Sequence, residues 1–126
     1  MRVACLDSSA LIALAFDEPK ALSIANRLRG FDRLESSNLL EAEFRAACRR
    51  EGVTFNAQSL EDIHWLLPDR PLTREIGAVL EIGSLRGADL WHLATALFAA
   101  TRPAEMAFVT LDRKQRAVAR ELGFRV

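Results

Sequence analysis

Four acidic side chains lie at positions where this sequence could use them for chemistry. Asp7 and Asp112 each come shortly after an apolar run. Asp89 stands in the first turn of one helical pattern, and Glu43 stands within another. Each aspartate also has an ordinary structural explanation, because aspartate caps helices well and a negative charge in the first helical turn is favoured by the helix dipole. Position alone therefore leaves a structural and a catalytic interpretation open for the three aspartates.

Glu43 is harder to explain as a structural residue. On the helix expected over residues 38–50, the positions three and four residues away from Glu43 on both sides are apolar, so the pattern places it in the middle of the face turned toward the core. Those four positions are Leu39, Leu40, Ala46 and Ala47. A carboxylate on such a face is costly unless it is protonated, paired or bound to a metal. Glu41 faces elsewhere and can pair with Arg45 at i+4, so Glu43 is the functional candidate.

The sequence offers these acids no obvious buried cation. Only Lys20 and Lys114 are lysine, and the other fifteen of the seventeen basic residues are arginine. Carboxylates that converge without cations suit a hard divalent ion, because Mg²⁺ and Mn²⁺ prefer oxygen ligands. Next to phosphates, such a cluster is a setting for metal-assisted phosphodiester hydrolysis.

The order of the expected elements determines whether the acids can meet. Short apolar runs alternate with helical patterns, which predicts an α/β fold with a parallel sheet covered on both faces. The expected strands are residues 3–6, 34–36 (as an edge strand), 63–67, 106–110 and 124–126, and the expected helices are residues 10–16, 19–29, 38–50, 57–62, 73–82, 88–100 and 113–122. In such sheets the working groups lie beyond the carboxyl ends of the strands. Asp7 and Asp112 occupy this position, because they follow the two clearest strands, residues 3–6 and 106–110.

The bulk properties fit one small globular domain. The chain has 126 residues and is 50% hydrophobic, enough for a core, so we expect a single domain over residues 1–126. Its formal net charge is zero, which argues against a protein that coats nucleic acid through bulk positive charge. The two cysteines, Cys5 and Cys48, are expected to be reduced and partly buried. With no segment apolar enough for a bilayer and no signal peptide pattern, we expect no membrane association and a cytoplasmic location.

Four segments, in order and at fitting separations, resemble motifs of one known family. They are residues 6–11 (LDSSAL), 37–43 (SNLLEAE), 85–94 (LRGADLWHLA) and 108–112 (FVTLD) together with 119–123 (ARELG). Each segment alone is a weak signal, and the four together are specific. The chain resembles the PIN-domain ribonucleases and, within them, the VapC toxins of bacterial toxin–antitoxin pairs. The second segment selects Glu43 over Glu41, in agreement with the helix pattern.

The resemblance implies both a fold and a function. The fold is a three-layer α/β/α sandwich with a mainly parallel central sheet, and the activity is cleavage of single-stranded RNA with Mg²⁺ or Mn²⁺. It also implies a small antitoxin protein as partner and a homodimer. Asp7, Glu43 and Asp89 would be metal ligands, directly or through water, and Asp112 would complete the cluster through water or a second ion. Ser9 and Thr110 would hold ligands or waters by hydrogen bonds.

Basic residues near the acids are candidates for RNA contacts. Arg86 precedes Asp89 and is the first choice for a phosphate contact. A stripe of the last helix, close to Asp112, offers further cations, although a solvated helix face explains this stripe equally well. It consists of Arg113, Arg116 and Arg120. For His92 a structural role is favoured over that of a ligand or general base, and the role of His64 stays open.

Three other functions compete with that of a nuclease. A phospho-accepting receiver domain needs a central aspartate after its third strand and a lysine after a late one, but residues 50–57 contain no aspartate and neither lysine follows a convincing strand. A nucleotide-binding module needs a glycine-rich phosphate loop, and none is present. A PIN fold that binds RNA or a partner without cutting is the remaining alternative.

Overall fold

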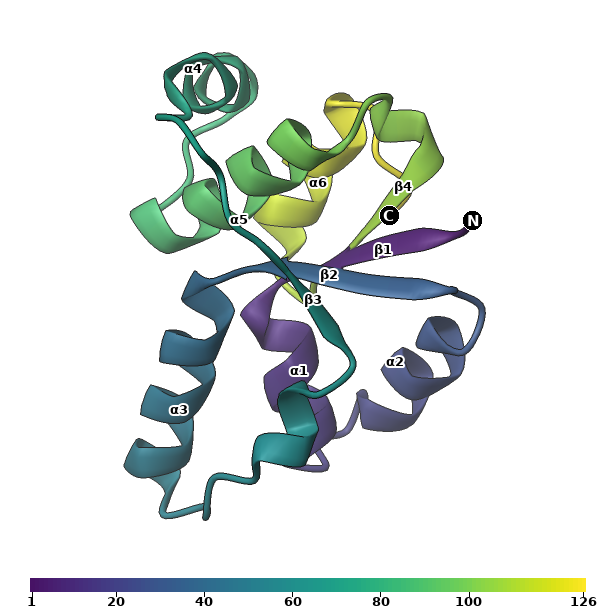
Figure 1. The fold of residues 1–126 in the computed structure, drawn as a ribbon, viewed down its shortest axis with the longest axis vertical. Coiled ribbons are helices and arrows are strands. Elements are labelled where there is room, and N and C mark those ends of the chain that lie inside the picture. Colours follow the sequence, from purple (N-terminus) through teal and green to yellow (C-terminus); the bar gives the residue numbers. More distant parts are fainter.

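A sheet of four parallel strands forms the centre of the molecule, as the computed structural model of residues 1–126 shows (Figure 1). The strands are β1 (Val3–Leu6), β2 (Arg33–Ser37), β3 (Ile63–Leu66) and β4 (Met106–Val109). Their order across the sheet is β3-β2-β1-β4, and every pairing is parallel. Because β1 and β4 are neighbours in register from Val3 and Met106 onward, the segments that follow them leave the sheet side by side.

Helices cover both faces of this sheet. In Figure 1 the first three helices lie below the sheet and the last three above it. The lower helices are α1 (Ser8–Ala15), α2 (Ala21–Leu28) and α3 (Leu39–Glu51), and the upper ones are α4 (Thr73–Ile82), α5 (Gly87–Ala99) and α6 (Arg113–Glu121). Two short 3₁₀ helices are η1 (Ala57–Leu60) and η2 (Pro103–Glu105). The expected three-layer α/β/α sandwich is therefore confirmed, and its sheet is wholly parallel.

Each face of the sheet has its own hydrophobic core, because successive strand residues point to opposite faces. On β1, Ala4 and Leu6 pack toward α1 and α3, while Cys5 packs toward α5 and α6. On β4, Val109 belongs to the first core and Phe108 to the second. Strands that are buried on both faces read as continuous apolar runs, which is why β1 and β4 are recognisable in the sequence.

The prediction of an edge strand over residues 34–36 was wrong in its place. This segment is β2, which is paired with β1 on one side and β3 on the other, and the edge strands are β3 and β4. β2 is hard to recognise because four of its five residues are polar, and three of these are nevertheless buried: Glu35, Ser36 and Ser37.

Smaller differences concern the helices and the C-terminus. Residues 124–126 form only an isolated bridge between Ala107 and Arg125, not a strand. The first helix begins at Ser8, two residues earlier than expected, because Asp7 is its N-cap. Cys5 and Cys48 are both buried free thiols. None of the helices is long and apolar enough to cross a membrane.

Candidate active site

The four acids come from four elements that meet at the carboxyl end of the sheet. Asp7 follows β1 and Asp112 follows β4, while Glu43 lies on α3 below the sheet and Asp89 lies in the first turn of α5 above it. Burial is the largest cause that raises the pKa of Asp89, and the negative charges of Asp7, Asp112 and Glu43 raise it further. The four carboxyl groups thus share one electrostatic environment. No three of them lie close enough together to hold a single metal ion directly.

Asp7 is a buried helix cap with a second contact. Its side chain is at the N-cap of α1, where Oδ2 accepts a hydrogen bond of 3.0 Å from the Ser9 backbone N–H. Its other oxygen, Oδ1, accepts from Nε2 of Gln115 at 3.2 Å. The capping interpretation is therefore correct but incomplete. Each carboxylate oxygen has one protein donor and keeps a further lone pair for another partner.

Asp112 is the exposed member of the group. It caps α6, because its Oδ1 accepts a hydrogen bond of 2.7 Å from the Gln115 backbone N–H. Its own backbone N–H donates to the hydroxyl oxygen of Thr110 at 3.1 Å. Since only one of its carboxylate oxygens is engaged, the other faces solvent and is free for a water molecule or an ion.

Asp89 is the acid with the fewest partners. Its side chain has no hydrogen bond or ion pair within the protein, and the N-cap of α5 is Arg86, which makes no side-chain capping bond. A partly buried carboxylate with no donor, beside three other carboxylates, is held in an unfavourable electrostatic position. Such a position is favourable only when a proton or a cation offsets the charge.

The structure corrects the predicted position of Glu43 on its helix. The buried face of α3 consists of Leu40, Phe44, Ala47 and Cys48, and Ala46 is exposed. Glu43 therefore lies at the edge of this face rather than in its middle, and its side chain is 33% exposed. Glu41 makes the expected surface ion pair with Arg45, at 3.2 Å. At this edge the Glu43 side chain is half-buried, so its carboxylate contacts both the protein interior and solvent.

His92 and Ser8 hold the Glu43 carboxylate. Glu43 Oε1 lies 2.5 Å from His92 Nε2 and 2.5 Å from Ser8 Oγ. The hydrogen bond from His92 is the largest effect and lowers the pKa of Glu43, the bond from Ser8 lowers it further, and burial opposes both. Because a carboxylate only accepts, the Nε2 atom carries the proton, and Nδ1 of a neutral ring accepts from the Ser37 hydroxyl 2.8 Å away. His92 thus hydrogen-bonds to Glu43 and to Ser37 and orients the Glu43 carboxylate, while its structural role stays a prediction.

Ser9 and Thr110 join the two strand ends that carry aspartates. Their hydroxyl oxygens lie 3.3 Å apart, and Ser9 Oγ accepts from the Leu111 backbone N–H at 3.0 Å. Thr110 Oγ1 donates to Gln115 Oε1 at 2.6 Å and lies 3.4 Å from Asp7 Oδ2. Both residues thus contact the groups around Asp7, and their role in holding ligands or waters stays a prediction.

Sequence reasoning missed three polar residues of this site: Ser8, Ser37 and Gln115. Ser37 is the last residue of β2, and Ser8 is the second residue after β1. Their position at the carboxyl end of the sheet was the available signal. Gln115 stands three residues after the cap Asp112, which is the spacing of a capping box. That pattern predicts a glutamine that reaches back to the cap. Instead its side chain is fully buried and points to Asp7.

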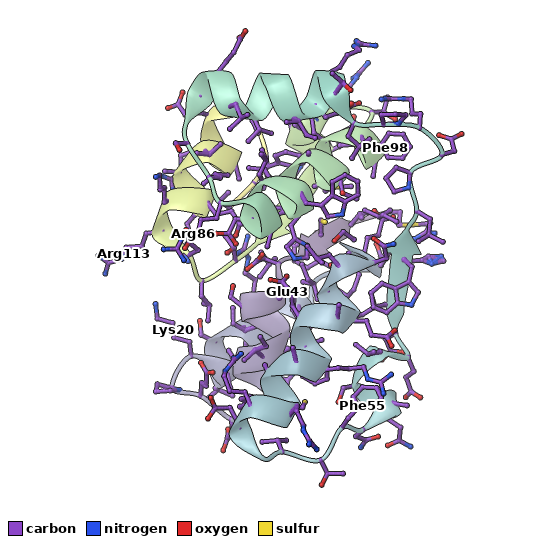
Figure 2. All side chains as sticks on the ribbon, turned by 90° about the vertical axis from the view of Figure 1, so that its left-hand side faces the viewer. Lys20, Glu43, Phe55, Arg86, Phe98 and Arg113 are labelled. Carbon is purple, nitrogen blue, oxygen red and sulfur yellow. The ribbon has the colours of Figure 1, made fainter.

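The predicted RNA contacts differ in how they lie. Arg86 lines a pocket of about 440 Å³ together with two of the acids, Asp89 and Asp112. The other residues of its lining are Ser84, Leu85 and Lys114. In Figure 2, Arg113 extends further out at the surface than Arg86. Arg116 already makes a hydrogen bond within the protein, because its Nη2 donates to the Thr110 carbonyl at 2.9 Å. Lys114, which was not predicted, faces this pocket.

The atoms of this site that could bind a metal fit a hard divalent cation. They are carboxylate oxygens, and the cysteine nearest to them in the sequence, Cys5, is fully buried with a pKa raised chiefly by that burial, so it supplies no thiolate. Mg²⁺ is usually bound by one or two carboxylates and several waters. An ion here would therefore touch one or two of the acids and reach the others through water, in keeping with their separation.

Comparison with known proteins gives the family. No curated protein matches the chain. The profile of the PIN domain matches residues 4–121, which include all four acids. PIN domains are generally nucleases that use divalent metal ions, and they commonly bind RNA and partner proteins. Since the match spans nearly the whole chain and the fold is the expected α/β/α sandwich, this chain belongs to the PIN-domain family.

Proposed function

We propose that this chain is a Mg²⁺- or Mn²⁺-dependent endoribonuclease that hydrolyses phosphodiester bonds in single-stranded RNA. One observation carries the proposal: four carboxylates meet at the carboxyl end of the sheet, and no lysine or arginine forms an ion pair with any of them. Such a group of acids is costly to maintain unless a cation binds there. The pKa of Asp89 supports this interpretation, because burial raises it and the negative charges of the other three acids raise it further.

The roles of the acids follow from their contacts. Glu43 is kept ionised by His92 and Ser8 and is ready as a ligand at neutral pH. Asp7 is held by one donor on each oxygen, and Asp89, which has no protein partner, gains most when a cation arrives. Asp112 would act through water because it is exposed. When bound, the ion would supply an acidified water and neutralise the charge that develops on the phosphate.

Cleavage should depend on a divalent ion and stop in a chelator. The purified chain is expected to cut unstructured RNA internally with Mg²⁺ or Mn²⁺, since the ligands are hard oxygens. Gel analysis of a labelled single strand, with the metal and with excess EDTA, measures this. Undiminished cleavage in EDTA would rule out the metal mechanism, and RNA binding without any cleavage under both conditions would favour the alternative, a PIN fold that only binds RNA or a partner.

The basic side chains of the pocket lead to a separate prediction about RNA binding. We propose that Arg86 and Lys114 contact RNA phosphates beside the acids, with Arg113 and Arg116 as further contacts along α6. Arg86→Ala and Lys114→Ala are therefore expected to weaken RNA binding in EDTA while metal binding stays intact. A neutralised phosphate contact should also reduce the salt dependence of RNA binding.

The cell biology of the chain is proposed on the resemblance to VapC toxins. In this proposal the chain acts in the cytoplasm as a homodimer, and a small antitoxin protein covers the acidic cleft, with an arginine or lysine of the antitoxin near the carboxylates. The same RNA cleavage assay tests it: the product of an adjacent gene should inhibit. Full inhibition by a protein that leaves metal and RNA access unchanged would contradict this mode of control.

A further inference from the structure

Gln115 is a neutral side chain that is fully buried among the acids. It lies on α6, and its amide Nε2 is 3.2 Å from Asp7 Oδ1 and 3.1 Å from the backbone oxygen of Asp89. Its amide oxygen, Oε1, is 2.6 Å from Thr110 Oγ1. One amide group therefore joins three segments: the end of β1, the first turn of α5 and the segment that follows β4.

The orientation of this amide follows from its partners. The Asp7 carboxylate and the Asp89 carbonyl only accept hydrogen bonds, so the nitrogen must face both of them. The amide oxygen then faces Thr110, whose hydroxyl donates its single proton to it at 2.6 Å. Because that proton is used, the 3.4 Å contact from Thr110 to Asp7 Oδ2 carries no donated proton. Gln115 is thus the only side chain that donates a hydrogen bond to Asp7.

From these contacts we infer that Gln115 is a positioning residue, which sets the Asp7 carboxylate and the start of α5 for binding of the divalent cation. The inference rests on the proposed metal-dependent nuclease function. Asp7 and Asp89 repel each other, and the amide holds both segments against this repulsion without adding charge. Groups that hydrogen-bond to metal ligands fix the ligands' orientation, and their loss typically costs 10–100-fold in metal affinity.

The test compares two glutamine-to-methionine substitutions in the intact chain. Gln115→Met keeps the length of the side chain and removes its donors, and Gln58→Met is the matched control, since Gln58 is the only other glutamine and is exposed on η1. Titration with Mn²⁺ alone, followed by electron paramagnetic resonance of the free ion, measures the affinity without RNA. Gln115→Met is expected to weaken Mn²⁺ binding about tenfold or more, while Gln58→Met leaves it unchanged. In cleavage, kcat should fall while KM for RNA stays close to that of wild type.

A double-mutant cycle separates positioning from general support of the fold. In an Asp7→Asn background the ligand that Gln115 orients is already impaired, so Gln115→Met should lower the Mn²⁺-induced rise in unfolding temperature much less than it does in wild type. Millimolar Mn²⁺ keeps this readout measurable when binding is weak. Equal effects in the two backgrounds would overturn the inference, because a purely structural role does not depend on Asp7.

A second variant guards against poor folding of the first. Gln115→Asn keeps a polar amide but is one methylene shorter, so it cannot span from α6 to Asp7, and we expect a loss of Mn²⁺ affinity in the same direction. Wild-type protein that neither binds Mn²⁺ nor cuts RNA would overturn the proposed function and this inference together. Wild-type protein that does both, with unchanged Mn²⁺ affinity in the folded Gln115 variants, would overturn the inference alone.

Discussion

Glu43→Gln is expected to abolish RNA cleavage, whereas Glu41→Gln should leave most of it. The glutamine side chain keeps the shape of Glu43 but removes the charge that His92 and Ser8 stabilise, and an amide is a much poorer ligand for a hard cation. The loss should exceed the roughly 10–100-fold that results when only a partner of a ligand is removed. Initial rates on a labelled single strand, with folding checked by circular dichroism, measure the difference.

The Glu41→Gln variant is a matched control, because it lies on the same helix, removes the same charge and differs only in its surroundings. Glu41 pairs with Arg45 at the surface, and such exposed i,i+4 pairs contribute only about 0.3–0.5 kcal/mol. Equal losses in the two variants, or a larger loss from Glu41→Gln, would mean that the wrong side of α3 has been assigned to the site.

Glu43 should also contribute to the loss of folding stability at acid pH. Its pKa in the folded protein is lowered, chiefly by the hydrogen bond from His92. A lowered pKa contributes stability that is present above the ordinary pKa of glutamate and is lost as the pH falls through the folded value. At neutral pH this carboxylate is therefore fully ionised, and the Glu43→Gln comparison tests the charged form.

The parts of the fold that the sequence predicts are those with strong local patterns. β1 and β4 are continuous apolar runs, and the aspartates beyond them could be placed at one edge of the sheet from the parallel topology alone. β2 was misplaced because Glu35 and its neighbouring serines look like loop residues, although they are buried in the middle of the sheet. Only the pairing with β1 and β3 explains their burial, and pairing is not a local property.

The same limit applies to the candidate site. Glu43 could be chosen over Glu41 by helix spacing, yet its position at the edge of the buried face depends on how α3 packs. The bonds from His92 to Glu43 and from Gln115 to Asp7 join residues 49 and 108 positions apart in the chain. No spacing rule connects such pairs. Asp112 and Gln115 have the spacing of a capping box, in which the glutamine would reach back to the Asp112 backbone N–H, but Thr110 accepts that hydrogen bond instead.

Asp89→Asn should make the metal-free protein at least as stable as wild type, while it weakens metal binding and removes cleavage. The substitution keeps nearly the same shape and removes the charge that Asp7, Asp112 and Glu43 repel. It also costs no hydrogen bond, since the Asp89 carboxylate has none in the protein. The gain is expected to be about 1 kcal/mol or less, because Asp89 is only partly buried and solvent screens the repulsion.

Thermal unfolding of wild type and mutant, each in EDTA and in excess Mg²⁺, tests both halves of this expectation. Wild type should gain more from Mg²⁺ than the mutant, because only a ligand that binds the native state raises the unfolding temperature in this way. The raised pKa of Asp89 sets the sign of the pH dependence: its charge destabilises the fold above the folded pKa, and the cost is relieved as the pH falls through that value. The difference between mutant and wild type in EDTA should therefore shrink in acid. A mutant clearly less stable than wild type in EDTA at neutral pH would show that the favourable interaction of Asp89 with the helix dipole of α5 outweighs its repulsion by the other acids. In that case the four acids would not act as one pocket.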